Sequence, residues 1–290
     1  MKTIMQKGIL AGAVALLTSV SALAQTDTTT TVLSQSTLHQ AYADEPVYKL
    51  KPAIDVPLTL GTAGLSILGF SKIYSKDATP QYKIENLRKS DLNGFDRWAA
   101  DVFHPEAEKP SDAVFYAAMP LPLLLMFDKD IRKDALKIGM LYIEAMGITG
   151  VFYTGSNYYV NRYRPLVYNE NAPMDERTAG GATNSFIAGH PALVATSTFF
   201  TAKVFSDYNP DSKLKPLFWG AAILSTGATA YWRHRAGKHF PSDLIVGTSI
   251  GALTGILVPH FHKNKLFKNP NMSLTPFSGD MYGLSFRYKL

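Results

Sequence analysis

The chain has 290 residues, with 29 basic and 23 acidic side chains and a net charge of +6. It contains no cysteine, which excludes disulfide bonds, a cysteine nucleophile and thiolate metal sites. The positive charge suits anionic substrates or membranes, but it is mild and forms no run of Lys and Arg that would indicate nucleic-acid binding.

The first 24 residues have the pattern of a cleaved signal peptide. Two lysines precede an apolar stretch at residues 8–20, and Ala22 and Ala24 then form a small-x-small cleavage pattern. An uncleaved membrane anchor is the alternative. The pattern predicts export, with a mature chain that begins near Gln25 and an active site that faces the periplasm.

Residues 25–45 are polar and rich in threonine, which predicts a flexible leader. Six apolar segments follow, with polar, turn-rich stretches between them. Glycine and alanine are frequent inside these segments and β-branched alternation is not sustained, so we expect helices and an all-α fold. The segments lie near residues 56–74, 113–127, 135–153, 191–205, 217–232 and 244–258.

The six segments suit either a membrane-spanning bundle or a soluble one. Several are shorter than the roughly 20 apolar residues that a span requires. Charged residues such as Glu144 and Lys203 interrupt two of them, and the mean hydropathy of the chain is only −0.02. If the signal peptide is cleaved, the mature N-terminus lies outside the cytoplasm. Six full spans would then place the stretches after the third segment, before the fourth and after the fifth, which carry the candidate motifs described below, in the cytoplasm. We therefore expect a periplasmic, membrane-associated bundle.

The C-terminal tail, residues 263–290, has a different periodicity. Leu284, Phe286 and Tyr288 alternate with polar residues, as in a strand. Residues 278–280 read Ser-Gly-Asp and fit a turn back to a preceding strand. We expect a short β-hairpin, with a disordered basic tail as the alternative.

One segment combines an arginine, a histidine and a carboxylate at the spacing R-x5-H-x3-D, as Arg233, His239 and Asp243. In a helix, residues four apart share a face, so the carboxylate can hold one ring nitrogen and leave the other free to attack. The arginine offers a fixed fork of donors that suits phosphate oxygens. A basic surface loop with a helix-capping aspartate is the alternative.

Two further motifs precede this segment. Residues 157–165 end in Arg-Pro, and residues 184–191 end in Gly-His-Pro. In chain order the three segments resemble the signature of the type 2 phosphatidic acid phosphatase superfamily, which reads K-x6-R-P, P-S-G-H and S-R-x5-H-x3-D. That group includes bacterial acid phosphatases, lipid phosphate phosphatases and vanadium haloperoxidases. The resemblance spans about residues 90–260 and implies a six-helix core bundle, which we place at residues 46–262.

The resemblance also implies phosphoryl transfer through a phosphohistidine. His239 would be the nucleophile, oriented by Asp243, and His190 would be the general acid that protonates the leaving alkoxide. Arg164 and Arg233 would neutralise the pentacoordinate phosphoryl group. No metal ion or other cofactor is implied.

Four more residues are candidates for phosphate binding. Gly189 lets the backbone approach a phosphate closely, and Ala188 offers its amide where the family has a serine. Asn157 stands where the family has a lysine, two helical turns from Arg164, and offers a hydrogen bond without a charge. Lys238, beside the nucleophile, is a candidate to replace that missing cation.

Three neighbouring features complete the prediction. Pro191 is favoured at the first position of a helix, so the residues before it are expected at a helix N-terminus, where free amides attract anions. Arg162, about 140° round a helix from Asn157, replaces the lost charge poorly unless the helix has ended. Residues 91–98 are interpreted as a helix entry packed over the bundle rather than as part of the site.

The sequence therefore predicts a metal-independent phosphatase of the cell envelope that acts on phosphomonoesters or lipid (pyro)phosphates. Phosphatidic acid, phosphatidylglycerol phosphate, undecaprenyl pyrophosphate, lipid A and small periplasmic phosphoesters all remain open as substrates. A membrane surface is an expected partner and nucleic acid is not; the oligomeric state is open. The alternatives are a non-catalytic or altered-specificity envelope protein that retains the fold, and, less favoured, a vanadium-dependent haloperoxidase.

Overall fold

The computed structural model describes residues 46–264 and two C-terminal strands at 272–277 and 283–288. The predicted signal peptide, the predicted leader up to residue 45 and the predicted turn at 278–280 lie outside the described residues.

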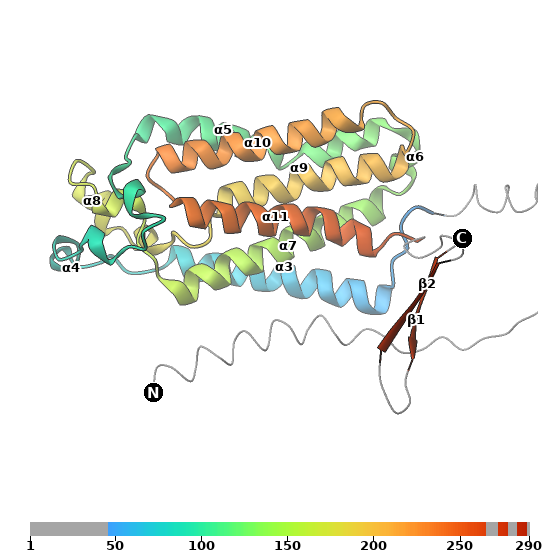
Figure 1. Ribbon diagram of the computed structural model, residues 1–290, viewed down its shortest axis with the longest axis horizontal. Coiled ribbons are helices and arrows are strands. Elements are labelled where there is room, and N and C mark those ends of the chain that lie inside the picture. The colour runs from blue at the N-terminus through green and yellow to red at the C-terminus, as the bar shows by residue number, and fades with distance from the viewer. Residues whose placement is uncertain (1–45, 265–271, 278–282, 289–290) are drawn as a thin grey trace, which may run out of the picture. The chain divides into compact units, whose positions relative to one another are not determined.

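Within the described part, six long helical segments pack side by side and form a bundle (Figure 1). The predicted all-α bundle is confirmed, and each predicted segment lies within one of these helices. The helices are α3 (Pro52–Tyr74), α5 (Glu108–Ala118) continued by η4 (Leu121–Phe127), α7 (Ala135–Val160), α9 (Gly189–Tyr208), α10 (Lys215–Arg235) and α11 (Pro241–Phe261).

The second segment is the one long segment that changes helix type. Pro120 and Pro122 follow the end of α5, and proline lacks the N–H that an α-helix needs and clashes with the preceding turn. The chain therefore continues as the 3-10 helix η4. Shorter helical turns lie in the connections: α4 (Gln81–Glu85), η1 (Lys89–Asp91), η2 (Arg97–Asp101), η3 (Pro105–Ala107), α6 (Lys129–Lys133), η5 (Pro165–Tyr168), α8 (Met174–Thr178) and η6 (Gly180–Thr183).

Helix α9 is the centre of the bundle. It packs against α11, α10, α7 and α5, whereas α3 packs mainly along α7. Small residues allow the closest of these contacts: a methyl group on Gly251 of α11 would lie 2.0 Å from the carbonyl oxygen of Ala192, and one on Gly255 would lie 2.5 Å from that of Thr196. Glycines at this four-residue spacing therefore let α11 lie directly on α9.

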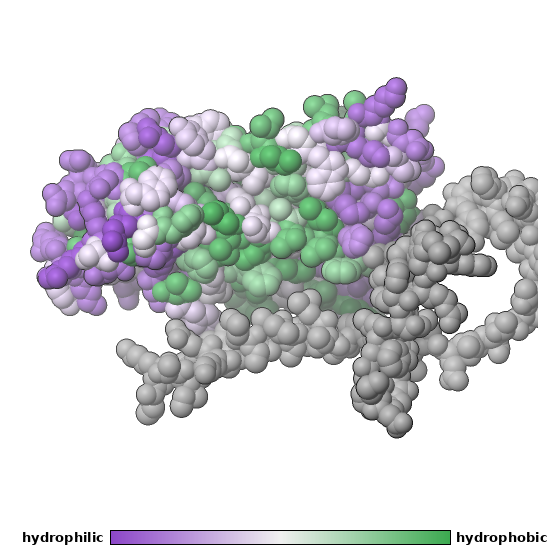
Figure 2. Space-filling model, in the orientation of Figure 1, coloured by the Kyte–Doolittle hydropathy of each residue, from purple (hydrophilic) through white to green (hydrophobic). Residues whose placement is uncertain are grey.

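The outside of the bundle carries many apolar side chains. Figure 2 shows a band of hydrophobic residues between two more polar ends. Within residues 46–264, four segments are long and apolar enough to cross a membrane: Pro52–Tyr74, Pro105–Phe127, Ala135–Val160 and Pro241–Phe261. Helix α7 has 26 residues, which is longer than its predicted apolar segment. The concern that the segments are too short for spans therefore does not apply to these four.

The C-terminal tail contains the predicted hairpin. Strand β1 (Met272–Phe277) pairs antiparallel with β2 (Gly283–Tyr288). The register places Met272 opposite Tyr288 and Phe277 opposite Gly283.

Candidate active site

The three motifs meet at one end of the bundle. They come from the end of α7, the start of α9, the end of α10 and the start of α11. Helix α7 ends at Val160, where Asn161 adopts the left-handed conformation with φ 48°, and the chain turns toward Arg164. Backbone hydrogen bonds tie the segments together: Ala188 N–H donates to the Asp243 carbonyl at 3.2 Å, and Leu166 N–H donates to that of Gly237 at 2.9 Å.

His239 is held with one ring nitrogen free. The ring is buried, at 3% exposure, and Nδ1 lies 2.7 Å from the carbonyl oxygen of Ser185. Because a carbonyl can only accept, Nδ1 carries the proton and Nε2 keeps its lone pair. Burial, and then the charge of Arg164, hold the pKa of His239 well below its ordinary value. The side chain is therefore a neutral imidazole with the tautomer that a nucleophile requires.

The predicted direct contact between Asp243 and His239 is wrong. The Asp243 carboxylate accepts hydrogen bonds from the Ser185 hydroxyl at 2.6 Å and from the Phe240 amide at 2.9 Å. His239 precedes α11, which begins at Pro241, so the pair does not share a helix face. Asp243 instead fixes Ser185, whose carbonyl oxygen holds the imidazole.

A second layer of charged residues supports this arrangement. The Arg162 guanidinium donates to Asp96 at 2.7 Å, to the Ser242 hydroxyl at 2.9 Å and to Asp243. It also lies over the Phe240 ring, 4.4 Å from the centroid. Helix α7 has ended before Arg162, as the charge-replacement alternative required, but this cation is fully engaged by carboxylates. Arg162 therefore does not replace the family lysine at a phosphate.

Asp96 makes residues 91–98 part of the support of the site, which corrects their interpretation as a helix entry alone. Its buried carboxylate accepts from the Ser242 amide at 3.0 Å and from Asn93 Nδ2 at 2.8 Å, besides Arg162. These hydrogen bonds lower the pKa of Asp96 although burial opposes them. One signal for this contact was visible in the sequence, because an arginine between a helix end and a buried motif needs a carboxylate partner.

The two predicted phosphate-binding arginines differ in their partners. Within the described residues, the Arg164 side chain makes no hydrogen bond or ion pair, and its Nε atom is buried. Arg233 is buried and pairs with Asp112 on α5 at 2.7 Å and with Glu108 at 3.5 Å. Both arginines lower the pKa of His239, so both lie near the nucleophile.

His190 is the second residue of α9, and its ring packs 4.5 Å from that of Phe115. Burial and then the charges of Arg233, Arg164 and Lys238 lower the pKa of His190 to about 3. Without a bound anion, His190 is therefore neutral near pH 7. An anion between the arginines would offset their charges and restore part of the basicity of His190.

Gly189 and Ala188 have packing roles that the sequence did not predict. A methyl group on Gly189 would lie 2.5 Å from the ring of Tyr153, so only glycine fits where α9 meets α7. In the described part of the chain, no group accepts the amide protons of Gly189 and His190, which leaves both amides for an anion. The Ala188 amide is engaged by Asp243, so the prediction that it binds phosphate is wrong.

Asn157 is also a structural residue. Its side chain is fully buried, and its Nδ2 group donates to the carbonyl oxygens of Tyr153 at 2.9 Å and Ile187 at 3.2 Å. Both amide protons are therefore used. The side chain of Asn157 joins α7 to the segment before α9 and has no donor left. The predicted phosphate contact of Asn157 is therefore wrong.

Lys238 lies beside the cluster and shares its charge with acidic residues. Its Nζ atom is 3.0 Å from Glu108 and 3.8 Å from Glu176. Lys238 also contributes to the lowered pKa of His190, which places its charge close to the site. Among the described residues, no group of three or more His, Cys, Asp or Glu side chains is arranged to hold a metal ion.

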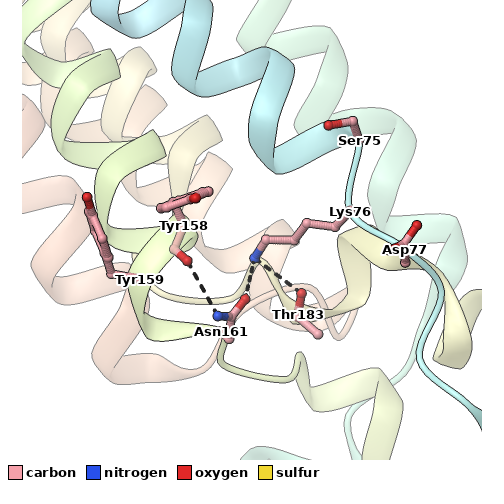
Figure 3. Close-up of a pocket in the computed structure, with 7 residues that line it drawn as sticks. All are labelled: Ser75, Lys76, Asp77, Tyr158, Tyr159, Asn161 and Thr183. Carbon is pink, nitrogen blue, oxygen red and sulfur yellow. Dashed lines mark hydrogen bonds between the residues drawn. The ribbon is translucent and has the colours of Figure 1, made fainter. Parts of the chain in front are cut away.

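A surface cavity of about 610 Å³ lies at the ends of α3 and α7, and none of the motif side chains predicted for catalysis lines it (Figure 3). Lys76 extends across it and donates to the Asn157 carbonyl at 2.8 Å, to Asn161 Oδ1 at 2.7 Å and to Thr183 at 3.4 Å. These contacts use all three ammonium protons and satisfy a carbonyl at the end of α7. Lys76 therefore caps the end of α7 in this cavity, and the cavity is not the catalytic site.

Comparison with known proteins identifies the part of the chain that carries these motifs. Residues 138–267 match the PAP2 superfamily model, and this segment contains all three motifs and the helices from α9 to α11. No curated protein and no solved structure matches the chain. The match supports a phosphatase-type function and a phosphorylated substrate in general terms. Residues 138–267, which carry the candidate site, thus match the PAP2 superfamily, the type 2 phosphatidic acid phosphatase superfamily that the sequence motifs resemble.

Proposed function

We propose that this protein is a cell-envelope phosphatase that hydrolyses lipid phosphates or other phosphomonoesters through a phosphohistidine at His239. The observation that carries the proposal is that the Arg164 guanidinium has no hydrogen bond or ion pair within the described residues, while its charge acts on the His239 imidazole, whose Nε2 keeps its lone pair. A cation near a buried site without a carboxylate partner is costly unless a ligand supplies the missing charge. A phosphoryl group is such a ligand.

In the first step, Nε2 of His239 attacks phosphorus and the bond from phosphorus to the alcohol oxygen breaks. Protonated His190 donates its proton to the leaving alkoxide. The Nδ1–H of the phosphohistidine stays hydrogen-bonded to the Ser185 carbonyl, and this hydrogen bond stabilises the positively charged ring. Arg164 and Arg233 hold the equatorial oxygens, where preorganised donors stabilise the developing charge most.

In the second step, a water molecule attacks the phosphorus of the phosphohistidine. Neutral His190 takes a proton from this water, the phosphorus–Nε2 bond breaks, and its electron pair returns to His239. Inorganic phosphate leaves, and His190 is again protonated for the next turnover. Splitting the transfer into two steps gives each one a lower barrier than direct hydrolysis.

The surface around the site supports a membrane location. Exposed tyrosine and tryptophan side chains gather toward the site end of the bundle, and such residues prefer the interface between lipid and water. Together with the four membrane-compatible segments, they favour a site at the level of lipid head groups. These aromatic residues are Tyr74, Tyr82, Trp98, Tyr116, Tyr158, Tyr159 and Tyr231.

The test is hydrolysis of phosphatidic acid and of a generic phosphomonoester by purified protein, with and without a chelator. We expect turnover that survives the chelator and disappears in His239→Ala. The matched control is His104→Ala, because His104 is a partly exposed histidine outside the motifs whose side chain, among the described residues, pairs only with Glu106. Near-parental rates in His239→Ala would sink the mechanism, and no turnover by the parent protein would favour a non-catalytic role.

A further inference from the structure

Helix α5 brings two carboxylates onto the cations of the site. Glu108 and Asp112 lie one helical turn apart and contact Arg233 at 3.5 Å and 2.7 Å. Glu108 also contacts Lys238 at 3.0 Å. Helix α5 lies outside residues 138–267, so these carboxylates come from a part of the chain that the family model does not match.

The position of Asp112 resembles that of a ligand. A single oxygen, Oδ1, lies 2.7 Å from Nη2 of Arg233 and 3.5 Å from Nε2 of His190. In the proposed mechanism, Arg233 contacts an equatorial phosphoryl oxygen and His190 contacts the leaving-group oxygen bonded to phosphorus. The Asp112 carboxylate thus occupies a place that the oxygens of the phosphoester need.

The exposure of the partners indicates which of them can move. The side chain of Arg233 is 5% exposed, whereas those of Asp112 and Glu108 are 36% and 39% exposed. An incoming anion can therefore displace the carboxylates toward solvent while the arginine stays in place. The charge of the site is also low: Arg164, Arg233 and Lys238 give +3, and Asp112, Glu108 and Glu176 offset it while His190 is neutral.

We propose that Asp112 is a specificity-determining residue that competes with the phosphoryl group for Arg233. The proposal rests on the proposed function of the site. Every phosphoryl ligand must displace this carboxylate or bind beside it, so the affinity for the phosphoryl group alone is low. Substrates with further contacts, such as a lipid chain in the bilayer, bind despite the competition. Small phosphoesters and the product, inorganic phosphate, bind weakly and leave readily.

The experiment is equilibrium binding of inorganic phosphate and of orthovanadate by calorimetry, using the full chain. We expect Asp112→Asn to lower both Kd values by roughly tenfold or more, the scale of one charge-assisted hydrogen bond regained by Arg233. Glu108→Gln should have a smaller effect, because Arg233 keeps Asp112. Glu106→Gln is the matched control, since Glu106 is a largely exposed carboxylate that, among the described residues, pairs only with His104, and it should leave the Kd unchanged.

Turnover kinetics separate competition from a positioning role. Under competition, Asp112→Asn lowers the KM of a small phosphoester more than it changes kcat. A second variant, Asp112→Ala, is measured in the same way. The proposal is overturned if the Kd values of both variants stay at or above the parental values. It is also overturned if neither the parent nor the variants bind either anion. A kcat that falls while Kd stays constant also overturns it, because Asp112 would then serve to align His190.

These outcomes are distinct from failure of the proposed function, because anion binding needs no turnover. Tighter binding in Asp112→Asn by a protein that hydrolyses no ester would retain the competition and reject the phosphatase. Hydrolysis that depends on His239, with unchanged anion affinity in Asp112→Asn, would retain the phosphatase and reject the competition.

Discussion

Arg162 and Arg164 are two residues apart, yet their surroundings are opposite. Arg162 is enclosed by Asp96, Asp243 and Ser242, and it also covers an aromatic ring. Arg164 has no hydrogen bond or ion pair from its side chain within the described residues. At these two positions, the cation that supports the fold is satisfied by the chain itself, whereas Arg164 is left without a partner within the described residues. The difference separates a support layer from a phosphate site within one loop.

The largest effect on activity is expected at Arg164, the arginine left for a ligand. Arg164→Met should lower kcat/KM by about 10²–10³-fold, the typical loss when one preorganised donor to the transition state is removed. The melting temperature should stay constant or rise, because no ion pair within the described residues is lost. Steady-state kinetics and thermal denaturation in detergent measure both quantities. A drop in melting temperature with unchanged kinetics would reverse the assignment of Arg164.

The support-layer arginine should show the opposite pattern. Arg162→Met leaves the buried carboxylates of Asp96 and Asp243 without their cation, and breaking a buried ion pair typically costs about 3–5 kcal/mol of unfolding free energy. Chemical denaturation checks this value. Arg132→Met is the control, because the Arg132 side chain, within the described residues, makes only a 3.4 Å contact with the Met126 carbonyl, so its loss should cost little unfolding free energy. If Arg162→Met is as stable as that control, the support layer has no energetic role.

A smaller effect is expected from pH. The pKa of His190 is lowered to about 3 in the folded state, so between pH 6.5 and 3 the unfolded state binds more protons. The contribution of His190 to stability is therefore present above pH 6.5 and is lost as pH falls toward 3. Melting temperatures across this range should fall more steeply for the parent than for His190→Asn. Equal slopes would show that His190 is not held neutral.

Bound phosphate should reduce the same dependence on pH. The anion offsets the charges of Arg164 and Arg233, which lower the pKa of His190 after burial does. The parent protein with phosphate should then lose less stability on acidification than the parent without it. No change on adding phosphate would place the bound anion away from His190.

Local patterns predicted the helices well. The apolar segments predicted the six helices because each one has to bury a face, and the break after α5 follows from Pro120 and Pro122. The motifs brought His239 and His190 to the same site, because each lies at a helix end where the chain turns. Each of these signals lies within its own short window of the sequence.

The supporting contacts could not be predicted in this way. Asp96 pairs with Arg162 across 66 positions, and Asp112 pairs with Arg233 across 121. Nothing in a short window indicates which distant carboxylate will meet a given arginine. The roles of Asn157 and Asp243 were misplaced for a related reason, since a spacing on an ideal helix gives no information about where the real helix begins.

The central claim is that His239 carries the phosphoryl group during turnover. The direct measurement is mass spectrometry of enzyme quenched during hydrolysis of a phosphomonoester, with the site of the phosphate mapped by fragmentation. The account predicts an acid-labile phosphate on His239 of the parent protein and its absence in His239→Ala. With a substrate that has a good leaving group, more of this phosphate should be found in His190→Asn, because the second step then lacks its base. Phosphate on another residue, or none on His239 while turnover proceeds, would contradict the account.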